Sequence, residues 1–272
     1  MAHPTPTPKD AHATEVHVEH IWSWAPIVIA LAVPFLYLAL LWPKYMIPIG
    51  VVIMFVGLGR WIQEDMRRFK RGAFLVPSHG GQPGPLMGTI LFIGTEVLIF
   101  GGIFAVWFVG KFHAASQGRV WGPGEHAELP ILATAINTAV LVASGGTLHW
   151  GFLRLRKGDM KGFRIGLVLT LILGAAFLVQ QVREYLNLIG EGLTIKGSEE
   201  HGIFGSAFYM LTGTHGLHVA GGLFVLLIVF VRALKNTQSK DHHILLESAA
   251  IYWHFVDVVW LFLFVVVYLG WL

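Results

Sequence analysis

Ionisable side chains interrupt the long apolar runs of this sequence, and five of them are of types and spacings that could do chemistry. Glu96 lies in one run, His215 and His218 lie close together in another, and His254 and Asp257 lie in the last. Ionisable groups at membrane depth are costly, so each one needs a partner or a function. Residues of these types can relay protons, ligate haem or a metal ion, or fasten helices together by hydrogen bonds.

The composition indicates an integral membrane protein. Of 272 residues, 55% are hydrophobic and only 13% are charged, whereas a soluble domain carries about 25% charged residues. A net charge of +3, divided among short loops, does not suggest nucleic-acid binding. The chain has no cysteine, which excludes thiolate metal sites, disulfides and covalently attached c-type haem.

Seven apolar runs, each near the ~20 residues that a spanning helix needs, predict an all-α membrane protein with seven transmembrane helices. The runs cover residues 22–42, 46–62, 86–110, 130–152, 163–183, 204–232 and 245–271. We expect residues 1–20 to form a flexible polar tail, whose histidines are solvated rather than metal-bound, and residues 21–272 to form a single domain. Lys44 is expected in a tight turn between Pro43 and Pro48, so that the first two helices form an antiparallel hairpin.

The distribution of basic residues predicts the orientation. With the N-terminus in the cytoplasm and seven spans, fourteen of the 19 Lys and Arg residues lie on the cytoplasmic side. This bias follows the positive-inside rule and places the C-terminus outside.

Glu96 lies about ten residues, or ~15 Å, into its predicted helix, close to the midplane. A free carboxylate is strongly disfavoured at that depth, so we expect Glu96 to be protonated or hydrogen-bonded. Two interpretations stay open. Glu96 is a functional group linked to protons, oxygen or lipid, or it is a neutral acid that fastens two helices.

The histidines favour structural roles. His215 and His218 are three residues apart and share a helix face, but the surrounding glycines and threonines suit close packing better than haem or metal ligation. On the last helix, mutual hydrogen bonding of His254 and Asp257 is preferred to a proton relay, with Glu247 two turns from His254. No span carries a central lysine, which excludes a seven-helix retinal protein.

The motifs on these helices resemble those of the cytochrome c oxidase subunit III family. The resemblance rests on residues 247–260 (ESAAIYWHFVDVVW), residues 205–218 of the sixth helix, residues 91–97 around Glu96, and Gln181 with residues 184–185. It extends from the second predicted helix to the C-terminus.

This resemblance implies a fold in which helices 1 and 2 are separated from helices 3 to 7 by a lipid-filled cleft. It implies a subunit with no catalytic centre, haem or copper of its own, which packs on the haem- and copper-bearing subunit I, alongside subunit II, and supports proton uptake and stability during turnover. Phospholipid is the expected ligand. By motif, the lipid-facing or buried polar residues are Glu96, Trp61, Arg67, His79, Arg232, His242 and His243. The packing and hydrogen-bond network comprises His215, His218, Glu247, His254 and Asp257.

Three alternatives remain open. The first is the equivalent subunit of a quinol oxidase, which typically has only five helices. The second is a proton-coupled transporter using Glu96 and Asp257, although no internal repeat is visible. The third is a haem-binding cytochrome, which the histidine pattern disfavours. A bacterial or archaeal cytoplasmic membrane is the expected location.

Overall fold

The computed structural model describes residues 43–70, 84–123, 128–195, 203–235 and 244–270, together with four single residues at 24, 27, 28 and 31. The regular elements in these ranges are all helices. They belong to two separate units, Met1–Val76 and Pro77–Leu272.

The first unit contains helix α2, Pro43–Lys70, whose apolar part is Pro48–Trp61. Because α2 begins at Pro43, Lys44 and Pro48 lie within its first turns, and the predicted tight turn at this position is wrong. Pro43 is well tolerated because the first backbone N–H groups of a helix have no intrahelical acceptor, whereas Pro48 lies inside α2 and leaves the carbonyl of Lys44 without its intrahelical donor. The predicted first span, 22–42, and its hairpin with α2 lie outside the described residues, apart from the four single ones.

In its described residues the second unit contains five helices that are long and apolar enough to cross a membrane. They are α3 (Gly84–Ser116), α4 (Ile131–Arg156), α5 (Met160–Gly190), α6 (Phe204–Leu234) and α7 (Ile244–Leu263), which continues into the π-helical turn η2 (Phe264–Leu269). The five corresponding predicted spans are confirmed as helices. Most extend beyond the apolar runs because a helix can continue into the headgroup region, where water satisfies its terminal carbonyls.

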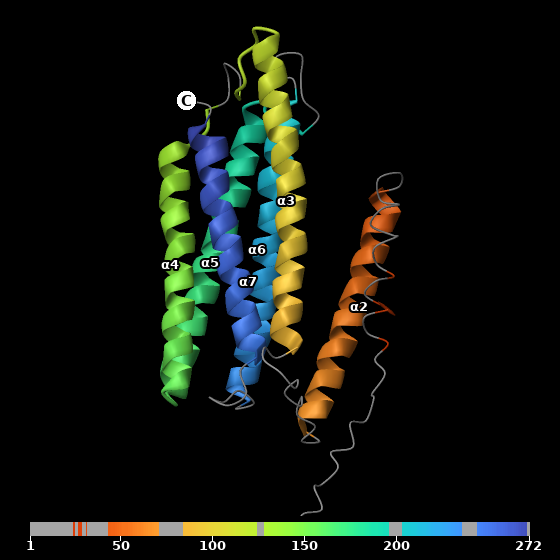
Figure 1. Ribbon diagram of the computed structural model, residues 1–272, viewed down its shortest axis with the longest axis vertical. Coiled ribbons are helices and arrows are strands. Elements are labelled where there is room, and N and C mark those ends of the chain that lie inside the picture. Colours follow the sequence, from red (N-terminus) through yellow and green to blue (C-terminus); the bar gives the residue numbers. More distant parts are fainter. Residues whose placement is uncertain are drawn as a thin grey trace, which may run out of the picture. The chain divides into compact units, whose positions relative to one another are not determined.

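The five helices pack side by side in an order that differs from the chain order (Figure 1). Helix α3 packs on α6 and α7, whereas α4 packs on α5 and α7. The closest approach is between α4 and α5, where a Cβ atom on Gly166 would lie 2.6 Å from the Cα of Gly151. Small residues permit this backbone contact, which is the usual basis of helix association in lipid.

The turn between α4 and α5 is set by its own sequence. Gly158 adopts a φ of 80°, in the left-handed region that glycine enters without steric cost. Asp159 then caps α5, because its Oδ1 accepts the backbone N–H of Gly162 at 2.9 Å. The two helices are therefore antiparallel neighbours with a short connection.

Tryptophans fill the interior of the second unit. Trp253 is fully buried between two glycines, and Cβ atoms added at Gly174 and Gly222 would lie 2.9 and 2.8 Å from its ring. Its indole Nε1 donates to Ser144 Oγ at 3.0 Å, and Trp260 Nε1 likewise donates to Thr138 Oγ1 at 2.9 Å. These two indoles thus join α7 to α4 through hydrogen bonds.

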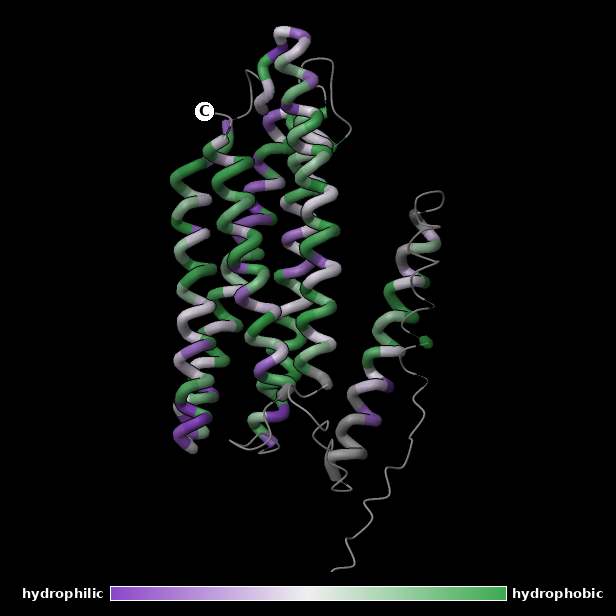
Figure 2. The backbone as a smooth tube through the Cα atoms, viewed as in Figure 1, coloured by the Kyte–Doolittle hydropathy of each residue, from purple (hydrophilic) through white to green (hydrophobic). Residues whose placement is uncertain are grey.

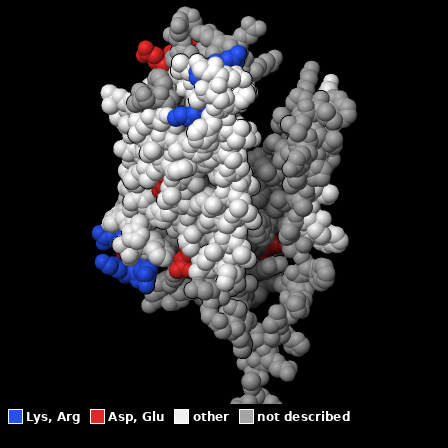
Figure 3. Space-filling model, turned by 45° about the horizontal axis from the view of Figure 1, so that its top comes forward, with Lys and Arg blue, Asp and Glu red and all other residues white. Residues whose placement is uncertain are grey.

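Hydrophobic residues predominate along the helices of the five-helix unit, and hydrophilic residues occur toward the helix ends and at a few places between them (Figure 2). On the face shown in Figure 3, Lys and Arg atoms gather near the ends and the middle carries very little charge. This pattern is the one expected for a bundle surrounded by hydrocarbon at mid-height.

Candidate functional site

A buried contact between two ionisable side chains joins α3 to α6. Glu96 is 8% exposed, and its Oε2 lies 2.8 Å from His218 Nε2. Glu96 lies about ten residues from Leu86, where the membrane span begins, or roughly 15 Å along the axis. Burying a carboxyl group at this depth costs free energy, so the group needs a hydrogen-bond partner.

The hydrogen bonds of His218 determine where the protons of this pair lie. His218 Nδ1 is 2.7 Å from the backbone carbonyl of Thr214, which can only accept, so Nδ1 carries a hydrogen. The contact between Nε2 and Glu96 then needs one further hydrogen, held by the carboxyl group or by the imidazole. In both forms the pair carries no net charge.

Aromatic side chains from α3 and α7 surround the pair. The ring of Phe100 lies 4.9 Å from the imidazole of His218, between centroids. The Tyr252 hydroxyl donates to the backbone carbonyl of His218 at 3.2 Å. The site is therefore a meeting point of α3, α6 and α7, with a single shared proton at its centre.

His215 faces a different environment from His218, although the two are three residues apart. It is fully buried, and its ring lies 4.9 Å from that of Trp260 and 6.0 Å from that of Phe177. Neither ring nitrogen has a hydrogen-bond partner among the described residues. Within that same part of the chain, no group of three or more His, Asp or Glu residues could hold a metal ion.

A second ionisable pair lies where α7 meets α4. His254 Nδ1 is 3.8 Å from Asp257 Oδ2, and the Asp257 carboxylate faces Gly145 of α4 so closely that a Cβ there would collide with it. Asp257 is buried, but 46% of the His254 side chain is exposed on the outside of the bundle. Oδ1 of Asp257 has no hydrogen-bond partner among the residues that the structure describes.

Known proteins resemble this chain along most of its length. The model of the family described as "Cytochrome c oxidase subunit III" matches residues 17–271. "Cytochrome c oxidase subunit 3" of Pelomedusa subrufa is 37% identical over 225 residues, covering 82% of this chain and 83% of that protein. The protein of the same name from Bos taurus is 37% identical over 222 residues, covering 81% and 82%.

A bacterial relative is similar at the same level. "Probable cytochrome c oxidase subunit 3" of Nocardia farcinica is 41% identical over 184 residues, covering 67% of this chain and 86% of that protein. The chain belongs to the cytochrome c oxidase subunit III family. It is therefore a membrane protein of the respiratory chain, and the resemblance inferred from the helix motifs is confirmed.

The structure describes four of the remaining candidate residues of this subunit III, and they belong to both units. Trp61 and Arg67 lie on α2, in the other unit; the Trp61 side chain is largely exposed, and that of Arg67 lies outside the description. Arg232 is half-buried in the last turn of α6, and Glu247 lies in the first turn of α7. His79, His242 and His243 lie outside the described residues.

One buried carboxyl group of this subunit III was given no role by the sequence interpretation. Glu184 of α5 accepts hydrogen bonds from the Tyr268 hydroxyl at 2.6 Å and from Thr134 Oγ1 at 3.2 Å. The side chain is 3% exposed and joins α4, α5 and η2. The sequence shows Glu184 about one helical turn after Gln181, near the end of an apolar run. It does not reveal that the partners of Glu184 are Thr134 and Tyr268, which are 50 and 84 residues away.

Proposed function

We propose that this chain is a non-catalytic accessory subunit of a respiratory cytochrome c oxidase. In this proposal it packs against catalytic subunit I, which carries haem and copper, in a complex that also contains subunit II. It supports proton uptake by subunit I and protects it from inactivation during turnover. It binds phospholipid between its first two helices and the five-helix unit.

The observation that carries this proposal, together with family membership, is the exposed imidazole of His254 on the outside of α7, beside the buried Asp257. His254 lies about ten residues, or ~15 Å, into the span Leu245–Leu269, and nearly half of its side chain is exposed. Lipid tails cannot hydrogen-bond to an imidazole, so a polar group exposed at this depth requires a protein neighbour. A transmembrane helix of subunit I that presents a polar side chain here meets that requirement.

The interior of the chain suits an accessory role. Glu96 bonds to His218, Glu184 to Tyr268, and Ser144 to Trp253, so these buried polar groups join helices of the same chain. Contacts of this kind stabilise a bundle. In our proposal Glu96 lies beside the lipid cleft, and its shared proton makes it the group through which the subunit assists proton uptake.

Orientation and lipid contacts complete the proposal. We place the protein in a bacterial or archaeal cytoplasmic membrane with seven spans, the N-terminus in the cytoplasm and the C-terminus outside. Headgroup contacts are assigned to Trp61, Arg67, His79, Arg232, His242 and His243. Support for this orientation comes from the basic residues Arg154, Arg156 and Lys157, which gather around the turn between α4 and α5.

Purification of a tagged form from its native membrane tests the proposal. In mild detergent we expect near-stoichiometric haem- and copper-bearing oxidase subunits and a haem spectrum, with oxidation of reduced cytochrome c rather than of a quinol. A stable, colourless protein without partners would contradict the accessory role, and quinol oxidation would assign the complex to the other oxidase class.

Deletion of the subunit tests the division of roles. We expect the remaining oxidase to reduce its haems at first, then to take up protons more slowly and lose activity progressively during turnover. Immediate loss of all haem reduction would show that electron transfer itself depends on this chain.

A further inference from the structure

Two buried polar side chains where α5 meets α6 have unpaired hydrogen-bonding atoms. Both ring nitrogens of His215 and both polar atoms of the Gln181 side chain lack a hydrogen-bond partner in the part of the chain that the structure describes. His215 is 0% exposed and Gln181 is 3% exposed, so bulk water reaches neither side chain. Buried polar groups are nearly always hydrogen-bonded, to protein or to ordered water, so four unpaired atoms require an explanation.

The register of α5 against α6 places these two side chains at the same level. The Tyr185 hydroxyl of α5 donates to Thr212 Oγ1 of α6 at 2.7 Å, which fixes the register of the two antiparallel helices. Gln181 precedes Tyr185 by four residues and His215 follows Thr212 by three, so each lies about one turn from this bond in the same direction. The ring of Phe177, one further turn along α5, lies 6.0 Å from that of His215. Gln181 and His215 are therefore neighbours.

The hydrogen bonds of Glu184 lead toward the same place. The Tyr268 hydroxyl of η2 donates to Glu184, and it also interacts with the Gln181 side chain, although not in hydrogen-bond geometry. The ring of Trp260 lies 6.1 Å from that of Tyr268 and 4.9 Å from that of His215. The Trp260 N–H is already donated to α4, so it is not available to His215. A small polar region thus lies among aromatic rings.

The π-helical turn η2 explains why Tyr268 reaches this region. In a regular α-helix each residue turns by about 100°, so Trp260 and Tyr268 would point in directions about 80° apart. A π-helix needs more residues for each turn, so η2 returns Tyr268 to the face of Trp260. Such turns occur frequently at functional sites.

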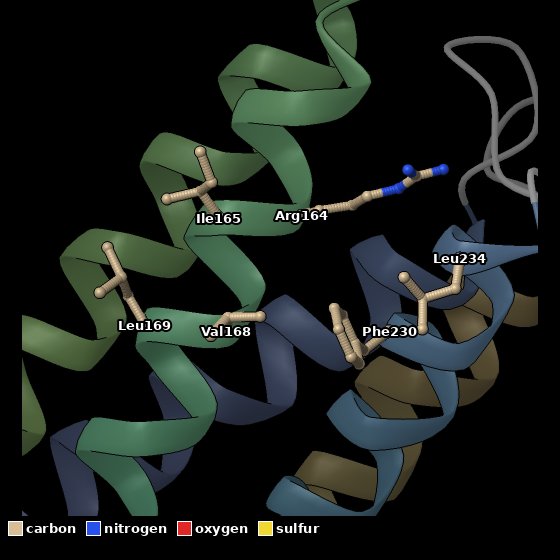
Figure 4. A pocket seen from close by; sticks show the side chains of 6 residues that line it. All are labelled: Arg164, Ile165, Val168, Leu169, Phe230 and Leu234. Carbon is tan, nitrogen blue, oxygen red and sulfur yellow. The ribbon is translucent and has the colours of Figure 1, made fainter.

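The region is distant from the groove on the outside of α5 and α6. That groove is lined by Arg164 and five apolar residues, and Figure 4 shows them on these two helices. Leu169 is the α5 lining residue nearest to Gln181 in sequence and precedes it by twelve residues, which is roughly 18 Å along the helix. The groove therefore supplies neither a partner nor an entrance for the buried polar atoms.

The unpaired atoms select a ligand that both donates and accepts hydrogen bonds. A neutral imidazole has one donor and one acceptor, and an amide has both kinds of group. The ligand must also be small, because the rings of Phe177, Trp260 and His215 are in mutual contact. A metal ion is disfavoured, since no group of three or more His, Asp or Glu residues within the described residues could hold one. Water meets all of these requirements.

We propose that at least one ordered water molecule is bound between His215, Gln181 and Tyr268. It accepts the Gln181 amide N–H, and it donates to the unprotonated ring nitrogen of His215 and to the Tyr268 hydroxyl oxygen. Three hydrogen bonds are typical of a buried water. The water extends the bonds of Thr134 and Tyr268 to Glu184 into one network that joins α4, α5, η2 and α6.

A high-resolution cryo-electron microscopy map of the protein, purified in mild detergent with its partners, tests the proposal directly. We expect a water peak about 2.7–3.2 Å from a His215 ring nitrogen, from the Gln181 amide and from the Tyr268 hydroxyl. A direct hydrogen bond between His215 and Gln181 would overturn the proposal. So would an empty region in a map that resolves other buried waters at the same local resolution.

Thermal unfolding of variants is an independent test. Gln181→Met and His215→Leu each remove one partner of the water, so each should lower the melting temperature. The double variant removes both partners and should lose less than the sum of the two single losses. Val219→Ala is the matched control, because Val219 is fully buried one turn from His215 but is apolar. Its effect should add to that of Gln181→Met.

Two results of these measurements would contradict a bound water. Strict additivity of Gln181→Met with His215→Leu, equal to that of the control pair, would show that no shared ligand couples the two side chains. A higher melting temperature in both single variants would show a dry site, because replacing unpaired buried polar atoms by apolar ones is then stabilising.

Discussion

His218 Nε2 lies 2.8 Å from Glu96 Oε2, which joins two helices through residues 122 positions apart in the chain. Since Nδ1 of the same ring donates to Thr214, the pair shares one proton and is neutral. A buried acid in this family member therefore has a defined partner, and the role of that partner can be tested.

Glu96→Gln should leave assembly largely intact. The amide has the size of the acid and can donate to His218 Nε2, so we expect a change in unfolding free energy within about 1 kcal/mol. Glu96→Leu leaves the imidazole nitrogen without its partner and should cost about 1–3 kcal/mol. Thermal unfolding and co-purification of partner subunits measure both. Loss of assembly in the glutamine variant would show that an ion pair is required.

Gly145→Ala should destabilise the contact between α4 and α7. Its Cβ would collide with the Asp257 carboxylate and lie 3.3 Å from His254 Nδ1. We expect a loss of about 1–3 kcal/mol from overpacking. The adjacent variant Gly146→Ala meets no atom within 4 Å and is the control. Similar melting temperatures for the two variants would contradict the observed position of Asp257.

Gly222→Ala should disturb the core around Trp253. The added Cβ would lie 2.8 Å from Cε3 of the indole, whereas at Gly221 the nearest atom, the Tyr252 hydroxyl oxygen, is 3.9 Å away. We expect Gly222→Ala to lower stability by about 1–3 kcal/mol and to change the fluorescence of the buried indole, and Gly221→Ala to do neither. An unchanged spectrum and melting temperature in Gly222→Ala would refute this packing.

Tyr268→Phe should weaken the attachment of η2 to α5. The substitution removes the donor to Glu184 Oε1 and leaves only the bond from Thr134, which we expect to cost about 1–3 kcal/mol. In the Glu184→Gln background, Tyr268→Phe should lower the unfolding free energy by less, because the hydroxyl stabilises a neutral amide less than it stabilises an acid. A double-mutant cycle measures the coupling, and strict additivity would argue against it.

The sequence predicted five of the seven proposed spans as helices of membrane length, because long apolar runs indicate burial in lipid. The predicted runs 86–110 and 163–183 lie within α3 and α5. Lys44 was misplaced because Pro43 and Pro48 were interpreted as a turn, although Pro43 is compatible with a helix start and a membrane helix can contain an internal proline such as Pro48. Local sequence does not distinguish these two cases.

The candidate site was predicted residue by residue but not as an arrangement. Glu96 and His218 were both recognised as polar groups within spans, yet His218 was considered beside His215, its neighbour in sequence. The structure turns the two rings toward different helices, one to Glu96 and the other to Trp260. Which buried groups meet depends on the order in which helices pack, and a single sequence contains no direct record of that order.

The neutrality of the Glu96–His218 pair has an electrical consequence. Moving one elementary charge across an energised membrane changes its energy by about 2.3 kcal/mol per 100 mV, so a lone carboxylate near mid-depth would feel roughly half of that. The shared proton cancels this force, because the pair has the same net charge of zero whichever group holds the proton. The bundle can therefore keep a polar contact at its centre while the voltage across the respiratory membrane rises and falls.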